Sequence, residues 1–137
     1  MRFLIFIATV VIFATSAQAQ DNLSGRFLFR VVEQSEVYAD TLSALIKGRG
    51  DIPNWVRNMV SRGGYVAMGS SRETVDGKPM ERFMACQAGH CPDSQLHVLF
   101  SADGKHAVMR VVDKDKGEVF LGDPSDAEKA ALIAPDD

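Results

Sequence analysis

The sequence predicts an α+β fold in which an antiparallel β-sheet of about five strands is flanked by helices and carries a protruding, disulfide-closed loop. Apolar residues recur at helical spacing between residues 35 and 62, and from residue 65 to residue 121 they form strand-length runs separated by short turns. Connections this short join antiparallel neighbours, because a parallel crossover needs a dozen or more residues. The loop is predicted by two cysteines with four residues between them, placed between two such runs.

The first segment expected to be ordered, Phe27–Val32, is apolar, and its periodicity fits a strand or a helix equally well. The next segment predicts a helix with Ser35 as its cap and Gly48 as its stop signal. Its apolar residues fall on one face and should point into the core. They are Tyr38, Leu42, Leu45 and Ile46.

A second short helix is expected to open at Pro53, which suits a first helical turn, and to end at Gly63-Gly64. Its inward face would be formed by Trp55, Val56, Met59 and Val60. We interpret Trp55, the only tryptophan, as a core anchor in preference to a platform for a ligand.

The strands are predicted from apolar runs and from the turn residues that separate them. A loosely alternating run covers residues 65–71, and Asp76-Gly77 is a strong signal for a two-residue hairpin between strands at 72–75 and 78–85. Later strands are expected at residues 95–101, 106–112 and 118–121. Ser125 and Glu128 then form a capping box for a final helix that runs to about Ala134.

The N-terminus is predicted to be a secretory signal peptide. The apolar run from Phe3 to Phe13 is too short to span a membrane comfortably, and Ala17-Gln18-Ala19 has small residues where signal peptidase reads them. We therefore expect residues 1–19 to be removed and residues 20–137 to form one exported domain with no membrane segment. An uncleaved anchor is less favoured, because the apolar run does not continue past Thr15.

Composition and the absence of known motifs disfavour several classes of function. With 18 acidic and 15 basic residues, the chain lacks the positive charge that a nucleic-acid partner requires. It contains no Gly-x-Ser-x-Gly elbow, no glycine-rich phosphate loop and no His-Glu-x-x-His motif. Acidic residues such as Asp113 and Asp115 lie in a charged turn, where solvation explains them. We therefore expect no enzyme activity, no catalytic residues and no cofactor.

The three histidines are not spaced from the cysteines as in a zinc finger, so we expect no metal site. His97 shares a strand face with Gln95 and Leu99 and is interpreted as a partly exposed strand residue. His106 follows a turn and should be solvated. A redox role for the cysteines is disfavoured, because the sequence has no Cys-x-x-Cys motif.

Export to an oxidising compartment favours a disulfide between Cys86 and Cys91. On chain-entropy grounds, a bridge across so short a loop contributes only about 2 kcal/mol, so it is better suited to stiffening one tip than to holding a domain together. A stiff binding tip and a simple strand-end staple are equally compatible with the spacing. The residues inside the loop are Gln87, Ala88, Gly89 and His90.

Several of these features occur in one order: Tyr38, the segment Asp51-Ile52-Pro53-Asn54-Trp55-Val56, Gly63-Gly64, the cysteine pair, and Ser94-Gln95 before an apolar strand. In this order, which covers nearly the whole mature chain, the sequence resembles the inhibitor of vertebrate lysozyme (Ivy) family. The resemblance implies a periplasmic protein with an antiparallel sheet flanked by helices, which in many members is a homodimer. It also implies that the partner is a C-type lysozyme, whose active cleft receives the loop bounded by Cys86 and Cys91.

The loop departs from the family pattern Cys-Lys-Pro-His-Asp-Cys. Ala88 stands at the family's proline, Gly89 at its histidine and His90 at its aspartate. His90 is therefore the residue we expect to be inserted, with Gly89 giving the backbone freedom to aim it and also softening the tip. The alternative is a binding module on the same scaffold that does not inhibit lysozyme. Its partner would be one of the cell's own peptidoglycan-cleaving enzymes or a glycan.

Overall fold

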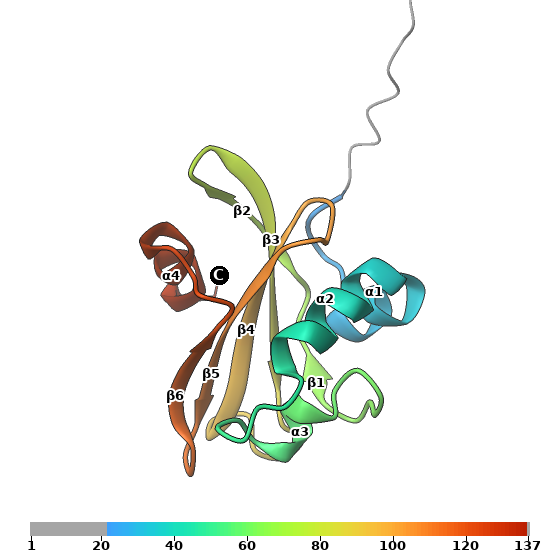
Figure 1. Cartoon of the computed structure of the whole chain (residues 1–137), viewed down its shortest axis with the longest axis vertical. Coiled ribbons are helices and arrows are strands. Elements are labelled where there is room, and N and C mark those ends of the chain that lie inside the picture. Colours follow the sequence, from blue (N-terminus) through green and yellow to red (C-terminus); the bar gives the residue numbers. More distant parts are fainter. Residues whose placement is uncertain (1–21, 137) are drawn as a thin grey trace, which may run out of the picture.

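The computed structural model describes residues 22–136, so the predicted signal peptide at residues 1–19 lies outside the described part of the chain. In chain order the elements are α1 (Leu28–Gln34), α2 (Glu36–Ile46), α3 (Asn54–Arg57), β1 (Val66–Ala67), β2 (Ser71–Val75), β3 (Lys78–Cys86), β4 (Ser94–Ser101), β5 (Ala107–Asp113), β6 (Gly117–Leu121) and α4 (Asp126–Ile133). The strands form one antiparallel sheet, with α1–α3 on one face and α4 on the other (Figure 1). The predicted α+β class is confirmed. No helix within residues 22–136 has both the length and the apolar character needed to cross a membrane.

The sheet has six strands but is only five strands wide. Its order is β1-β3-β4-β5-β6, and β2 pairs with the same strand as β1, at the other end. The run at residues 65–71 is split because the backbone of Ser70 bonds to the N-terminal segment instead of to β3. The Gly25 N–H donates to the Ser70 carbonyl, and the Ser70 N–H donates to the Arg26 carbonyl, both at 2.8 Å.

The other predicted strands agree with β3, β4, β5 and β6 to within one residue at each end. The hairpin between β2 and β3 is confirmed. Asp76 and Gly77 both have positive φ, which a type I′ turn requires and which matches the twist of the strands.

The main core lies between α1–α3 and the sheet. Tyr38, Leu42 and Ile46 of α2 are buried in it, as the helical spacing predicts. The sheet contributes Phe83, Val98, Phe100 and Met109, among others. A smaller cluster on the opposite face holds α4 through Leu132.

The helix ends differ in part from expectation. The undecided segment at residues 27–32 belongs to a helix, α1. Ser35 occupies the cap position of α2 but its side chain makes no capping bond, whereas the capping box of Ser125 and Glu128 is present. The helix opened by Pro53 is only four residues long, and hydrogen-bonded turns carry the chain on to Arg62.

The expectation that His97 is partly exposed is wrong, since only 6% of it is exposed. The C-terminal tail covers it: the carboxylate of Asp136 lies 3.0 Å from Nε2 and also pairs with Arg82. Desolvation lowers the pKa of His97, and the hydrogen bond to Asp136 opposes that shift. The imidazole is therefore part of the packing beneath the C-terminus.

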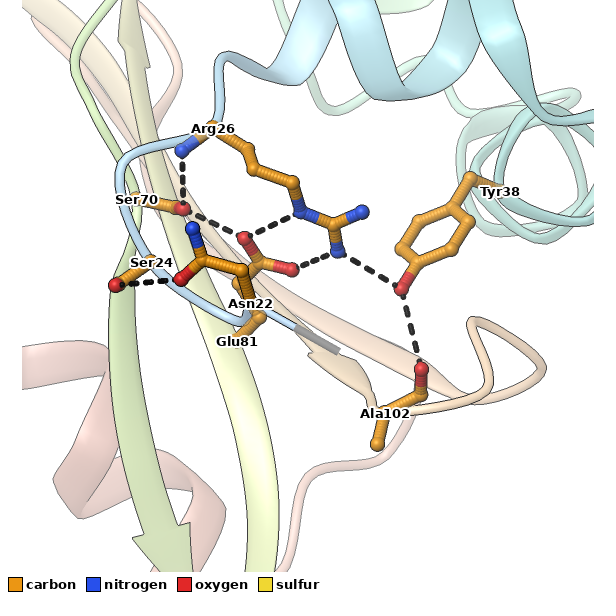
Figure 2. A network of polar contacts seen from close by, with 7 residues as sticks. All are labelled: Asn22, Ser24, Arg26, Tyr38, Ser70, Glu81 and Ala102. Atoms are coloured by element: carbon orange, nitrogen blue, oxygen red, sulfur yellow. Dashed lines mark hydrogen bonds and ion pairs between the residues drawn. The ribbon is translucent and has the colours of Figure 1, made fainter. Parts of the chain in front are cut away.

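An ion pair between a fully buried carboxylate and a partly exposed guanidinium fixes the start of the domain to the sheet (Figure 2). Glu81 of β3 is fully buried and accepts hydrogen bonds from the guanidinium of Arg26 and from the hydroxyl of Ser70. Arg26 also donates to the Tyr38 hydroxyl, which in turn donates to the carbonyl of Ala102. The network ties the N-terminal segment, α2, β3 and the β4–β5 turn together.

Candidate functional site: the Cys86–Cys91 loop

The loop between β3 and β4 is closed at its base. Cys86 and Cys91 form the predicted disulfide, with their Cα atoms 4.9 Å apart. Beside it the Gln87 N–H donates to the Ser94 carbonyl at 3.0 Å, which extends the β3–β4 pairing by one step. Both the covalent bond and the sheet therefore determine where the loop begins and ends.

The tip is a tight turn formed by residues 87–90. The His90 N–H donates to the Gln87 carbonyl at 2.9 Å, and Gly89 has a φ of 77°. Ala88 is not among the residues with positive φ, so the pattern is that of a type II turn, in which glycine is favoured at the third position. Gly89 is thus required by the geometry of the turn, in addition to any freedom that it gives the tip.

The backbone of His90 is held on both sides. Its carbonyl accepts hydrogen bonds from the N–H groups of Asp93, at 3.0 Å, and Ser94, at 2.9 Å. Its side chain, with Ala88 and Gly89, is exposed, whereas Cys86 is buried. The backbone that carries the exposed imidazole is therefore hydrogen-bonded, and of the predicted loop residues Ala88, Gly89 and His90 are exposed whereas Gln87 and Cys91 are half-buried.

Below the tip, a chain of hydrogen bonds crosses from α3 to β5. The indole Nε1 of Trp55 donates to the Ser94 hydroxyl at 2.8 Å, and that hydroxyl donates to Asp113 at 2.6 Å. The other carboxylate oxygen of Asp113 accepts from the N–H groups of Asp115 and Lys116. These contacts anchor the first residue of β4, directly after the loop.

Asp113 is 7% exposed, so the expectation that solvation explains it is wrong. Desolvation tends to raise the pKa of its carboxyl, but the hydrogen bonds from Ser94, Lys116 and Asp115 lower it below its usual value. The sequence carries one signal that could have identified this role. An Asp that opens a short turn ending in glycine often accepts backbone N–H groups within that turn.

Nothing in the described residues suggests metal chemistry at the loop. Within residues 22–136, no group of three or more His, Cys, Asp or Glu side chains is arranged to hold an ion. The disulfide also removes both thiols as ligands. The exposed part of the loop carries one imidazole on a backbone closed by the disulfide and by hydrogen bonds.

Replacing both cysteines by serine should affect binding more than folding. We expect the free energy of unfolding to fall by about 2 kcal/mol, because the bridge closes a very short loop. Binding should weaken further, since the released tip must be ordered at roughly 1–2 kcal/mol per backbone residue. Denaturant unfolding and titration against a loop-binding partner measure the two effects separately. Equal losses in the free energy of unfolding and in the free energy of binding would show that the bridge is only a structural staple.

Comparison with protein-family models gives no match for this chain, and comparison with curated proteins gives no significant match.

Proposed function

We propose that this chain is a periplasmic inhibitor of C-type lysozyme that inserts the Cys86–Cys91 loop into the active cleft. The observation that carries the proposal is the tip itself. Its base is closed by a disulfide, the backbone of His90 is hydrogen-bonded on both sides, and its imidazole is exposed. The resemblance to the Ivy family supports the same conclusion, because in that family the corresponding loop is the inhibitory element.

The chemistry of the target suits an imidazole. A lysozyme cleft holds two carboxyl groups, one kept protonated by a raised pKa and one ionised, on either side of the bond to be cleaved. An imidazole can accept from the protonated group and donate to the ionised one, and as a cation it can donate from both nitrogens. Hydrogen bonds to a charged carboxylate in a water-poor cleft are stronger than neutral ones.

Rigidity matters as much as chemistry. A loop that must be ordered on insertion loses part of its binding free energy to that ordering. Here the disulfide, the turn at residues 87–90 and the contacts of Ser94 to Trp55 and Asp113 order the loop beforehand. Less of the free energy of contact would then be lost to ordering the loop.

One observation favours the alternative, a binding module with another partner. Gly89 stands where the Ivy family has histidine, and its φ of 77° is a conformation that residues with side chains rarely adopt. The imidazole therefore leaves the turn one residue later, from His90. A partner with a differently placed acceptor, such as an endogenous wall-cleaving enzyme, would suit that position.

The two functions are separated by a lytic assay. Purified residues 20–137 are added in increasing amounts to a C-type lysozyme acting on bacterial walls. We expect lysis to fall and to reach complete inhibition as the chain saturates the enzyme. If lysis stays unchanged at a large molar excess of folded protein, lysozyme is not the target and the binding-module alternative stands.

A further inference from the structure

A pocket of about 430 Å³ lies beside the loop, between it and the segment that runs from α3 to β1. Gln87 and Ala88 form the loop's side of the pocket, and α3 with the turns after it forms the other. Its volume falls within the range of small-molecule sites in proteins. The pocket is separate from the imidazole of His90, which is not part of its lining.

Apart from the aromatic residues Trp55 and Tyr65, the polar side chains of the pocket are three amides and one guanidinium. Asn54, Asn58 and Gln87 line it together with Arg62, and its lining within residues 22–136 contains no carboxylate. Each amide side chain both donates and accepts hydrogen bonds, as hydroxyl and acetamido groups also do. Without a carboxylate the lining has no negatively charged side chain to pair with a cation, and it has a single arginine for a phosphate chain.

The apolar surface of the pocket is aromatic. Trp55 and Tyr65 both line it, with ring centroids 6.2 Å apart and planes inclined at 40°. Trp55 is half-buried against the core and is fixed through its indole N–H by Ser94, so it cannot turn away without breaking that bond. Rigid aromatic surface next to amides suits a ligand with an apolar ring face and a polar edge.

We propose that this pocket binds an N-acetylated hexose, a ring with C–H faces, hydroxyl groups and one acetamido group. The ring would lie against the aromatic surface, while the amide of Gln87 and the side-chain carbonyl of Asn58 would bond its hydroxyl and acetamido groups; the Nδ2 of Asn58 already donates to the Asn54 carbonyl at 2.9 Å. This class of sugar forms the glycan of bacterial walls. The proposal goes beyond lysozyme inhibition and does not depend on it, because the pocket and its ligand require no second protein.

Trp55 allows a direct test, because it is the only tryptophan and its fluorescence therefore reports on the pocket. The chain is titrated with the trimer of N-acetylglucosamine, and separately with maltotriose, a neutral trisaccharide without acetamido groups. We expect a saturable change with the first sugar and binding at least about tenfold weaker with the second, the cost of losing one good hydrogen-bonded group. Calorimetry under the same conditions checks that the change reflects binding.

Two variants assign the site. Gln87→Ala and Asn58→Ala should each weaken binding of the acetylated trimer at least about fivefold. Gln34→Ala is the matched control, since it removes an exposed amide from α1, away from the pocket lining. Unfolding curves confirm that each variant is folded.

Three results would overturn the proposal. They are no saturable binding of the acetylated trimer at millimolar concentration, binding of maltotriose as tight as that of the acetylated trimer, or an affinity for the acetylated trimer in folded Gln87→Ala and Asn58→Ala that equals that of the unaltered chain. None of these measurements contains lysozyme, so they stand apart from the lytic assay. A chain that inhibits lysozyme but binds no sugar refutes only this inference. A chain that binds the sugar but leaves lysozyme active refutes only the proposed function.

Discussion

If the chain inhibits lysozyme as proposed, replacing His90 by alanine should weaken that inhibition by about 2 kcal/mol or more, which is roughly a thirtyfold rise in the inhibition constant. The imidazole is the only ionisable side chain among the exposed residues of the tip, Ala88, Gly89 and His90. Its removal would leave the carboxyl groups of the cleft without a partner in a desolvated site. Titrating the variant in the lytic assay gives the constant directly.

His106→Ala is the matched control for this prediction. His106 is also an exposed histidine, but it lies at the β4–β5 turn, at the opposite end of β4 from the loop. Its removal should leave the inhibition constant unchanged. If His90→Ala inhibits as well as the unaltered protein while remaining folded, the contact lies elsewhere on the surface.

Replacing Arg26 by methionine should lower the free energy of unfolding by about 3–5 kcal/mol, the usual cost of leaving a buried charge without its partner. Glu81 is fully buried, and without Arg26 its carboxylate would keep only the hydroxyl of Ser70. The N-terminal segment would also lose its link to Tyr38. Denaturant unfolding at neutral pH, monitored by the fluorescence of Trp55, measures the loss.

A double-mutant cycle shows whether the unpaired charge of Glu81 causes the loss of stability in Arg26→Met. Changing Arg26 and Glu81 together to methionine should recover much of the stability, because an apolar pair of similar volume leaves no buried charge. Arg30→Met is the matched control, since Arg30 pairs with Glu33 on the exposed surface of α1, where such pairs contribute about 0–1 kcal/mol. A double variant that is less stable than Arg26→Met alone would contradict this account of the network.

Local signals in the sequence were sufficient for most of the fold. The spacing of Tyr38, Leu42 and Ile46 identified the buried face of α2, and Asp76-Gly77 identified the hairpin. The capping box at Ser125 marked the start of α4. Each of these signals depends on residues that lie within a few positions of one another, where propensity and turn geometry act directly.

The features that sequence analysis missed depend on residues far apart in the chain. His97 is buried because Asp136 of the C-terminal tail packs over it, and β1 ends early because Ser70 pairs with the N-terminal segment. Glu81 forms its ion pair with Arg26, which lies 55 positions earlier in the sequence. No periodic pattern encodes such contacts, since tertiary packing alone selects them.

The candidate site likewise combines features that local sequence signals predicted with features that depend on distant contacts. The cysteine spacing and the predicted export signal indicated the closed loop, and the disulfide is present. The type II turn at Gly89 and the bond from Ser94 to Asp113 were not predicted, because they depend on backbone geometry and on the neighbouring strand. They determine how the tip is held and therefore from which residue the imidazole projects.

The central claim is that His90 contacts the catalytic carboxyl groups of lysozyme. It is tested most directly by a double-mutant cycle between this chain and lysozyme. The binding free energy is measured for the unaltered chain and for His90→Ala, each against a C-type lysozyme and against its variant with the ionised aspartate of the cleft changed to asparagine. We predict a coupling of about 1.5 kcal/mol or more, as found for close charged pairs in interfaces. Additive effects, to within roughly 0.3–0.5 kcal/mol, would place His90 away from that carboxyl group and contradict the account.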